Sequence, residues 1–199
     1  MEKIDVGILG LSADPPTLGH IQLAQFVLNS CNLDEVWLLP ANIHVYNKNM
    51  VDSNHRLKMC EIAAKVDKRI KVFDYEIINN LKGDTYTFLK NLKNEKDLND
   101  NFNFSLIIGL DNANTFNKWK NYKKVEKMIK FIVVSRNGIE RDLNVNWYLK
   151  SPHVFLEQKS QIVQSSSSQI RENLKNKNVD STIDKNVLNY ILKNKLYKN

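Results

Sequence analysis

The sequence predicts an α/β protein with a mainly parallel, doubly wound sheet of the Rossmann-like type and a small helical part near its C-terminal end. Short apolar runs alternate with amphipathic segments along the chain. The apolar runs are continuous, as expected of strands that are buried on both faces. Residues with chemical character follow these runs or begin the amphipathic segments, where a parallel sheet forms its ligand crevice.

The predicted strands are short apolar runs that end at glycine, proline or polar residues. The first begins close to the N-terminus and ends at Gly10, and the second ends at Pro40. The fourth is strongly apolar and is closed by Gly109. The six strands are expected at residues 6–9, 35–39, 70–75, 104–108, 131–134 and 154–156.

The predicted helices are amphipathic segments that begin at polar or glycine-containing turns. Residues 83–87 open one that carries Phe88, Leu89 and Leu92. Another begins near Ser53 and is expected to turn four side chains toward the core, namely Leu57, Cys60, Ile62 and Ala64. The others are expected at residues 18–30, 111–116 and 123–129, from the serine run to about 175, and at 184–196. Residues 93–103 are expected to be a solvated connection and 135–146 a loop.

Length and composition indicate one globular domain, residues 1–199, with its helical C-terminal part at about 165–199. Hydrophobic residues make up 42% and charged residues 26%, which are ordinary values for a folded domain. No apolar run approaches the ~18 residues that span a bilayer, and the first residues lead into a strand. We therefore expect a soluble, cytoplasmic protein with no membrane partner.

The charge balance favours small anionic ligands over nucleic acid. The formal net charge is +7, but the lysines are scattered through a chain that is also rich in asparagine. The two cysteines, Cys31 and Cys60, lack the close spacing of a zinc site or a redox pair and are expected to be buried free thiols. Neither a nucleic-acid partner nor a protein-bound metal is expected, and association into a homo-oligomer stays open.

The first motif runs from Gly10 to His20, Gly-Leu-Ser-Ala-Asp-Pro-Pro-Thr-Leu-Gly-His, between the first strand and the first helix. Free N–H groups at a helix start attract anions. Thr17 and His20 are three residues apart, so both side chains can face the same end of the sheet and hydrogen-bond phosphate oxygens. The alternative is a plain turn in which Gly19 and His20 only help to cap the helix.

The second motif, Ser-Ser-Ser-Ser-Gln-Ile-Arg, lies at residues 165–171 and precedes another amphipathic helix. Serine hydroxyls at a helix start, with Arg171 about one turn in, form a second candidate anion site. The alternative is a flexible polar linker. Two candidate anion sites in one domain favour an enzyme that handles phosphates.

Together these residues resemble the signatures of nicotinate mononucleotide adenylyltransferases, which belong to the nucleotidyltransferases related in fold to class I tRNA synthetases. The resemblance rests on residues 10–20, on the Ser-Ser-Ser-x-Ile-Arg motif ending at Arg171, and on Ile-Gly-Leu-Asp at residues 108–111 followed by Phe116 and Trp119. Residues 54–59 and 86–87 also occupy the places expected for the family. Only residues 135–152 have no counterpart.

The resemblance implies adenylyl transfer from ATP. The 5′-phosphate of nicotinate or nicotinamide mononucleotide would attack the α-phosphorus of ATP in line, and pyrophosphate would leave with Mg²⁺ as the cofactor. The nucleophile is already an anion, so the protein needs to supply mainly positioning and charge stabilisation. ATP and a pyridine mononucleotide are the implied partners, and the product is the dinucleotide of the NAD pathway.

The resemblance also assigns roles to residues. His20, Thr17 and Arg171 are the implied catalytic residues. The implied ATP-binding residues are Gly10, Leu11, Ser12, Gly19, His20, Lys48, Gly109, Asp111, Ser167, Ser168 and Arg171. The implied mononucleotide-binding residues are Tyr86, Thr87 and Trp119, with Trp119 stacking on the pyridine ring.

Several of these residues have plainer alternatives. Asp111, Thr85 and Thr87 could be helix caps, Trp119 a core aromatic, and Lys48 a solvated loop lysine. Arg56 could anchor its helix through a salt bridge. The other histidines, His44, His55 and His153, are expected to be structural or surface residues.

The chain departs from the family pattern at several positions. Thr17 stands where most relatives have a histidine, and Leu11 and Ala13 replace a glycine and a phenylalanine. The loop at residues 41–48 lacks the usual bacterial Pro-Pro-His-Lys run, so the preference between nicotinate and nicotinamide is open. Alternative functions are a pantetheine-phosphate adenylyltransferase, a non-catalytic nucleotide-binding protein on the same scaffold, and an RNA-binding module supported by charge alone.

Overall fold

The computed structural model describes residues 2–43, 50–136, 138–158, 162–163, 166–176, 178 and 181–198. Across these residues a six-stranded sheet has the order β3-β2-β1-β4-β5-β6, and every neighbouring pair is parallel. The strands are β1 (Ile4–Leu11), β2 (Glu35–Pro40), β3 (Ile70–Val72), β4 (Phe102–Gly109), β5 (Lys130–Val134) and β6 (Val154–Leu156). The predicted doubly wound α/β fold is confirmed.

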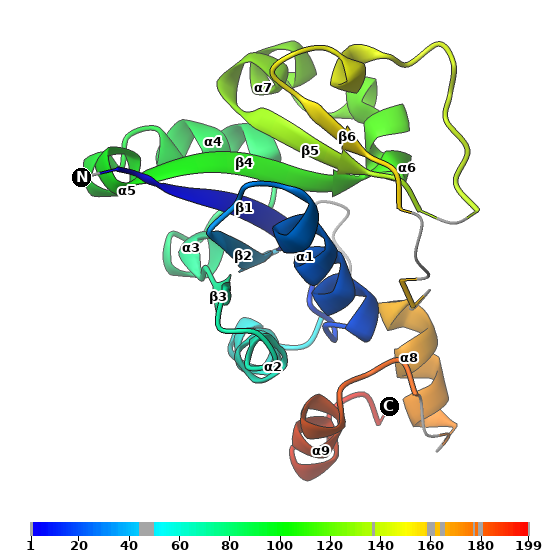
Figure 1. Cartoon of the computed structure of the whole chain (residues 1–199). Helices are drawn as coiled ribbons and strands as arrows, with labels where there is room; N and C mark the ends of the chain where they lie inside the picture. Colours follow the sequence, from blue (N-terminus) through cyan, green and yellow to red (C-terminus); the bar gives the residue numbers. More distant parts are fainter. Residues whose placement is uncertain are drawn as a thin grey trace.

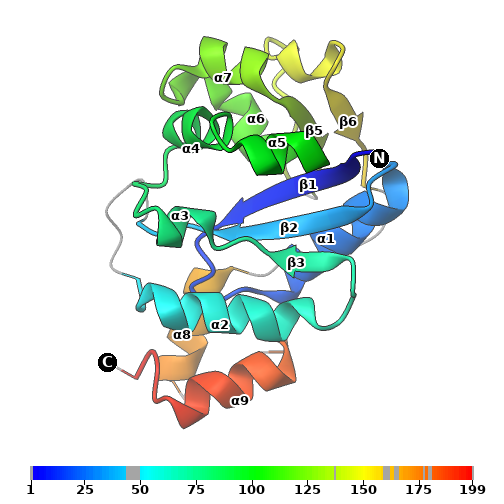
Figure 2. The same cartoon turned by 90° about the vertical axis from the view of Figure 1, so that its left-hand side faces the viewer.

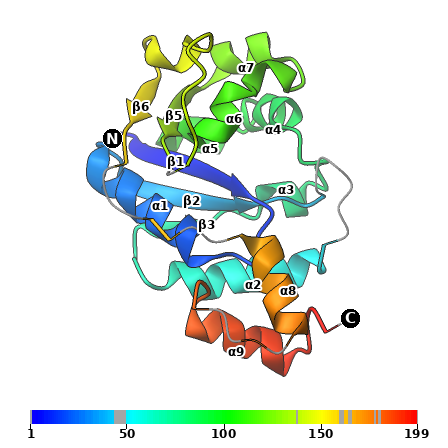
Figure 3. The same ribbon diagram turned by 90° about the vertical axis from the view of Figure 1, so that its right-hand side faces the viewer.

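Helices cover both faces of the sheet (Figure 1). Below the sheet in Figure 2 lie α2 (Ser53–Ala64), α8 (Ser167–Lys175) and α9 (Lys185–Lys193), with α9 beneath α2. α1 (Leu18–Ser30) packs against the same face (Figure 3). The other face carries α3 (Tyr75–Ile78), α4 (Thr85–Leu92), α5 (Lys96–Asn101), α6 (Leu110–Asn114), α7 (Tyr122–Met128) and the 3-10 turns η1 (Phe116–Lys118) and η2 (Trp147–Leu149).

Alternation along β1 divides the buried side chains between two cores. Leu9 and Leu11 join the core that α1, α2, α8 and α9 cover, whereas Val6 and Ile8 join the core on the opposite face. Because successive side chains of a strand point to opposite faces, a continuous apolar run supplies both cores at once. None of the helices in the described part of the chain combines the length and apolar character needed to cross a membrane.

The second half of the predicted third strand is wrong. β3 ends at Val72, and Tyr75 begins α3 instead. The Tyr75 ring is buried in the second core, and its hydroxyl donates to Glu95 Oε1 at 2.8 Å. Burial of this aromatic ring overrides the strand preference of the apolar sequence around it.

The predicted solvated connection at residues 93–103 contains α5 and the first residues of β4. α5 buries no side chain, so it leaves no hydrophobic periodicity to detect. The Asn99 side-chain amide holds it by donating to the carbonyls of Leu92 and Glu95 at 2.8 and 2.6 Å. The expected loop at residues 135–146 is followed by η2, where the Trp147 ring stacks on Phe116 with centroids 4.2 Å apart.

The core face of α2 also differs from the prediction. Cys60 and Ala64 are buried as expected, but Leu57 and Ile62 are half-buried, and the fully buried positions include Arg56, Met59 and Ala63. Both cysteines are free thiols; Cys60 is buried, whereas Cys31 is only half-buried. The α2 helix is therefore rotated so that an arginine, and not a leucine, faces the inside of the protein.

The Arg56 guanidinium is 1% exposed and binds backbone carbonyls, not a carboxylate as expected of a salt bridge. Its Nε donates to Val51 O at 2.8 Å, and its two terminal nitrogens donate to Ser12 O at 3.0 Å, to Asn42 O at 2.8 Å and to Ala41 O. These carbonyls belong to the loop after β1, the loop after β2 and the segment that leads into α2. One buried cation therefore joins three segments of chain.

We predict that Arg56→Lys lowers the free energy of unfolding by about 2 kcal/mol or more, because an ammonium group cannot reach all four carbonyls and leaves some of them buried without a donor. Urea denaturation of the two proteins measures this change. Arg69→Lys is the matched control, since Arg69 is a surface arginine paired with Asp67 and its replacement should leave the midpoint unchanged. Equal midpoints for Arg56→Lys and the unmodified protein would contradict the structural role given to Arg56.

Candidate active site

A cavity of about 550 Å³ opens at the carboxyl ends of β1 and β4, where the strand order reverses. Ligands of open parallel sheets bind at this position. Residues 9–12 and 106–109 contribute the ends of the two strands and the start of the loop after β1. Further residues that line it are Glu76, Tyr86, Asp111, Trp119 and, from α1, His20. The first motif and the Gly109–Asp111 segment are therefore brought together, as predicted.

Thr17 and His20 form a capping box at the start of α1. The Thr17 hydroxyl lies 2.8 Å from His20 Nδ1 and also accepts from the His20 backbone N–H at 3.4 Å. Thr17 is 2% exposed, and it is absent from the cavity lining. In the structure its hydroxyl faces the histidine ring, and the expected contact between this hydroxyl and a phosphate is replaced by a role in positioning His20.

The capping box fixes which nitrogen of His20 carries the proton. The Thr17 backbone N–H can only donate, and it lies 3.1 Å from His20 Nδ1. Nδ1 must therefore accept, which leaves the proton on Nε2 as the donor available to a ligand in the cavity. Burial and, to a smaller extent, the charge of Arg136 together lower the pKa of His20 from 6.5 to about 4. The ring is neutral at pH 7 and acts as a hydrogen-bond donor.

The loop that follows β1 supplies backbone to the cavity. Gly10, Leu11 and Ser12 line it, and a Cβ placed on Gly10 would meet nothing within 4 Å. The space over Gly10 is thus open to a ligand. Gly19 lies in the first turn of α1 and is not part of the lining.

The Gly109–Asp111 segment places a carboxylate without a partner at the edge of the cavity. Asp111 Oδ1 is buried and has no hydrogen-bond partner among the described residues. A Cβ on residue 109 would collide with this oxygen, so only glycine allows the carboxylate to fold back over the end of β4. A buried acceptor without a donor is costly, and a ligand hydroxyl in the cavity would satisfy it.

Two of the three residues expected at the mononucleotide lie on the cavity wall. Tyr86 and Trp119 line it, and the Trp119 ring also packs edge-on against Phe116 with centroids 5.3 Å apart. Thr87 does not line it. Its backbone N–H donates to Asp84 Oδ1 at 2.9 Å and its hydroxyl to Asp84 Oδ2 at 2.8 Å, so Asp84 caps α4 and Thr87 is engaged in that cap.

The second motif docks on the first, as predicted. Arg171 donates to Asp14 O at 2.6 Å and forms an ion pair with Asp14 Oδ2 at 3.5 Å. Ser167 Oγ donates to Pro15 O at 2.8 Å, and Arg171 also donates to Ser168 Oγ at 3.1 Å. Residues far apart in the sequence therefore meet at the loop that carries Thr17 and His20.

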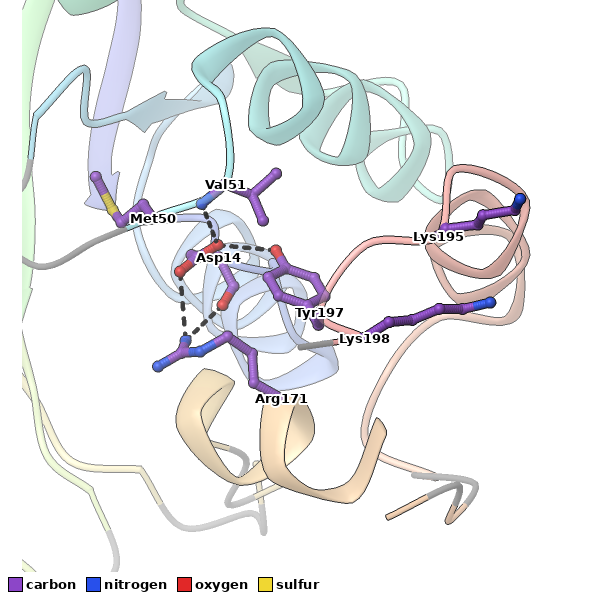
Figure 4. Close-up of a pocket in the computed structure, with 7 residues that line it drawn as sticks. All are labelled: Asp14, Met50, Val51, Arg171, Lys195, Tyr197 and Lys198. Carbon is purple, nitrogen blue, oxygen red and sulfur yellow. Dashed lines mark hydrogen bonds and ion pairs between the residues drawn. The ribbon is translucent and has the colours of Figure 1, made fainter. Parts of the chain in front are cut away.

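Arg171 nevertheless lines a different cavity from His20. Figure 4 shows this neighbouring cavity of about 500 Å³, in which the guanidinium points at Asp14. The Tyr197 hydroxyl donates to Asp14 Oδ1 at 2.8 Å, and Val51 N donates to the same oxygen at 3.2 Å. Neither Ser167 nor Ser168 lines the cavity that holds His20. The expectation that both motifs face one cavity directly is therefore met only in part.

The remaining residues singled out in the sequence are structural or lie elsewhere. Lys48 and His44 fall outside the described residues. His55 Nδ1 lies 2.8 Å from the Tyr190 hydroxyl, and His153 Nδ1 accepts from Phe131 N at 3.2 Å. The structural expectation for these two histidines is confirmed.

Five charged residues of the cavity wall were not predicted, namely Glu76, Asp84, Lys118, Lys120 and Arg136. A signal existed for Arg136, because it follows β5 by two residues and so lies at the carboxyl edge of the sheet. Lys118 and Lys120 flank Trp119, which the sequence had already assigned to the ligand, so their position beside it was a signal for them. Glu76 lies just after the predicted strand at residues 70–75, in a helix that was not predicted. The described residues include no group of three or more His, Cys, Asp or Glu able to hold a metal ion.

Comparisons with known proteins agree with this geometry. The profile of the cytidylyltransferase-like family matches residues 8–173. The chain is similar to the nicotinate-nucleotide adenylyltransferase of Bacillus subtilis, with 33% identity over the whole of both chains, and to the probable nicotinate-nucleotide adenylyltransferase of Bacillus licheniformis, with 31% identity over 97% of this chain and 98% of that protein. In fold it is similar to the Plasmodium falciparum nicotinic acid mononucleotide adenylyltransferase complexed with NaAD, with a TM-score of 0.82, 24% identity, and 98% and 97% of the two chains covered.

We predict that His20 is neutral at pH 7, carries its proton on Nε2 and titrates near pH 4. Because this pKa lies below the unfolded value of about 6.5, the contribution of His20 to stability is present above pH 6.5 and decreases as the pH falls toward 4. Two-dimensional ¹H–¹⁵N NMR of the imidazole measures both the tautomer and the pKa. Thr17→Val removes the hydroxyl and should destabilise the cap by about 1 kcal/mol. A ring that is protonated at pH 7, or one that carries its proton on Nδ1, would contradict the assignment.

Proposed function

The chain belongs to the cytidylyltransferase-like family, and we propose that it transfers the adenylyl group of ATP to nicotinate mononucleotide, or to its nicotinamide counterpart, in NAD biosynthesis. The product would be the dinucleotide, and pyrophosphate would leave. The observation that supports this best is one cavity that holds a neutral histidine donor, an unpaired buried carboxylate and an aromatic ring together at the switch point of the sheet. The three groups suit a phosphate, a ribose and a pyridine ring.

In the proposed reaction the mononucleotide phosphate attacks the α-phosphorus, and the bond from that phosphorus to the bridging oxygen of pyrophosphate breaks. Charge builds on the α-phosphate oxygens as this occurs. The Nε2–H of His20 donates to one of these oxygens, and because the imidazole is neutral it needs no proton from solvent to do so. A donor that is held in place before the reaction stabilises the transition state without reorganisation.

The adenosine part of ATP is proposed to lie over the ends of β1 and β4. Gly10 leaves room for it, and Asp111 Oδ1 accepts a ribose hydroxyl. At the other end of the cavity, Trp119 and Tyr86 provide flat apolar surface for the pyridine ring. The N-terminus of α4, whose first N–H groups have no helical partners, lies beside them.

The β- and γ-phosphates are proposed to extend from His20 toward Arg171. This guanidinium has five N–H donors and uses some of them in hydrogen bonds to Asp14 and Ser168, so others remain for phosphate oxygens. Ser168 is exposed at the start of α8, and Lys48 is proposed to reach the same phosphates from its loop. Mg²⁺ enters as part of the Mg·ATP substrate, which suits a metal that binds mainly to phosphate oxygens.

We propose the cytoplasm as the location of this reaction and small nucleotides as the partners. The free thiols of Cys31 and Cys60 suit a reducing compartment. The scattered lysines give no reason to add nucleic acid to the partners.

The proposal predicts pyrophosphate release when the protein is incubated with ATP, Mg²⁺ and nicotinate or nicotinamide mononucleotide, and none with phosphopantetheine. A coupled pyrophosphate assay measures it. Release with phosphopantetheine alone would assign the chain to the sister activity. ATP binding without release from any acceptor would leave a nucleotide-binding protein in place of an enzyme.

We predict that His20→Ala lowers turnover by roughly 10²–10³-fold, the usual loss for one transition-state donor. The matched control is His55→Ala, which removes a histidine that contacts Tyr190 and lies outside the cavity lining, so turnover should stay unchanged. Urea denaturation shows whether His20→Ala remains folded at the assay temperature. Unchanged turnover in a folded His20→Ala protein would remove His20 from the mechanism.

A further inference from the structure

Glu76, on α3, is a buried carboxyl group of the cavity wall that the proposed chemistry leaves without a role. It is 5% exposed and lines the same cavity as Tyr86 and Trp119. Its Oε2 accepts a hydrogen bond from Asn42 N at 3.3 Å. Burying a carboxyl group costs free energy unless its oxygens are well paired. One long backbone hydrogen bond is weak compensation, so Glu76 is well suited to contact a ligand.

The surroundings of Glu76 place it at the pyridine end of the cavity. The nearby Asp84 charge acts on it, and Asp84 is the residue that caps α4 just before Tyr86. The proposed function assigns Tyr86 and Trp119 to the pyridine ring. Glu76 therefore lies beside the part of the substrate in which nicotinate and nicotinamide differ.

The two substrates make opposite demands on a carboxyl group. The carboxylate of nicotinate only accepts hydrogen bonds, whereas the amide of nicotinamide also has an NH₂ group that donates. An ionised glutamate can accept from that amide but repels a carboxylate. A protonated glutamate can donate its O–H to the carboxylate.

We propose that Glu76 is the specificity-determining residue for the pyridine substituent, donating its O–H to the nicotinate carboxylate when protonated and accepting the amide N–H of nicotinamide when ionised. This inference rests on the proposed function. The protonation state of this one buried carboxyl group then sets the ratio of kcat/KM for the two substrates.

The charges around Glu76 make this balance sensitive near neutral pH. The pKa of Glu76 is raised from 4.5 to about 7, mainly by burial and also by the Asp84 charge, against the opposing effects of the Asn42 N–H and the Arg56 charge. Lys120 is engaged by Asp84 at 3.2 Å, which reduces the effect of its charge on the cavity. The other charged or titratable groups of the cavity wall are His20, Asp111, Lys118 and Arg136. Asp74 precedes Glu76 on the approach to its own helix.

The test compares kcat/KM for the two mononucleotides between pH 6 and 9. Titrations of ATP, of the mononucleotide phosphate and of other protein groups affect both substrates alike, so they cancel in the ratio. In the unmodified protein the ratio of nicotinate to nicotinamide follows the ratio of protonated to ionised Glu76, so it should fall by about tenfold for each unit of rising pH. Glu76→Gln keeps the shape and an acceptor for Asn42 N but does not titrate, so its ratio should be flat. Glu61→Gln, which changes an exposed glutamate of α2, should keep the pH dependence of the unmodified protein.

Equilibrium dialysis of each mononucleotide over the same pH range provides a readout that is independent of turnover. A flat ratio in the unmodified protein, or a slope that persists in Glu76→Gln, would overturn the role of Glu76. Turnover of either mononucleotide in the same assays would still support the proposed function. If neither mononucleotide binds at any pH, the proposed function and this inference fail together. A ratio that falls with pH in the unmodified protein and not in Glu76→Gln supports both.

Discussion

The buried guanidinium of Arg56 is the interaction on which the shape of the cavity depends. It donates to carbonyls of the loop after β1, the loop after β2 and the segment before α2. Inside the protein these carbonyls would otherwise be left without donors, at a cost comparable to that of a lost hydrogen bond each. Arg56 binds Ser12 O on the side of the cavity near His20, and it binds Asn42 O while Asn42 N donates to Glu76 on the pyridine side. One side chain thus links the end of the cavity that is proposed to hold phosphate to the end that is proposed to hold the pyridine ring.

Asp14 is a second centre, and it ties the end of the chain to the loop that precedes α1. It is 3% exposed and has contacts with Val51 N, the Tyr197 hydroxyl and Arg171. Burial raises the pKa of Tyr197, and hydrogen bonding to Asp14 keeps its hydroxyl protonated as a donor. Ile170 of α8 and Val187 and Ile191 of α9 pack into the core on the same face. The C-terminal helices are therefore part of the wall around the proposed phosphate path, and their docking positions Arg171.

The sequence predicts the positions of the buried strands well, because continuous apolar runs are a clear signal of a parallel sheet. It also predicts which segments meet, since the ends of parallel strands share one edge of the sheet. It does not predict what each side chain does there. Thr17 and Arg171 are polar groups that could face a ligand or the protein. A local capping interaction turns Thr17 toward His20, and a tertiary hydrogen bond turns Arg171 toward Asp14. Glu76 was missed because α3, Tyr75–Ile78, has only four residues and is too short to show a helical pattern in the sequence.

In the proposed reaction, the site stabilises the transition state through donors that the protein holds in fixed directions. Three of the basic groups near the proposed substrate are neutral or engaged: His20 has a pKa of about 4, Arg171 is paired with Asp14, and Lys120 with Asp84. Lys118 and Arg136 line the same cavity as His20 and add positive charge to it. Pairing weakens the attraction for an already charged triphosphate but keeps each donor in a fixed direction. A fixed donor stabilises most strongly the site where new charge develops, which is the α-phosphate oxygens in the transition state. This extra stabilisation of the transition state raises the rate, whereas equal attraction for the ground state and the transition state would not. Thr17 fits the same logic: compared with a histidine it gives up the chance of a positive charge, and its hydroxyl, 2.8 Å from His20 Nδ1, helps to orient the ring that is proposed to meet the reacting phosphate.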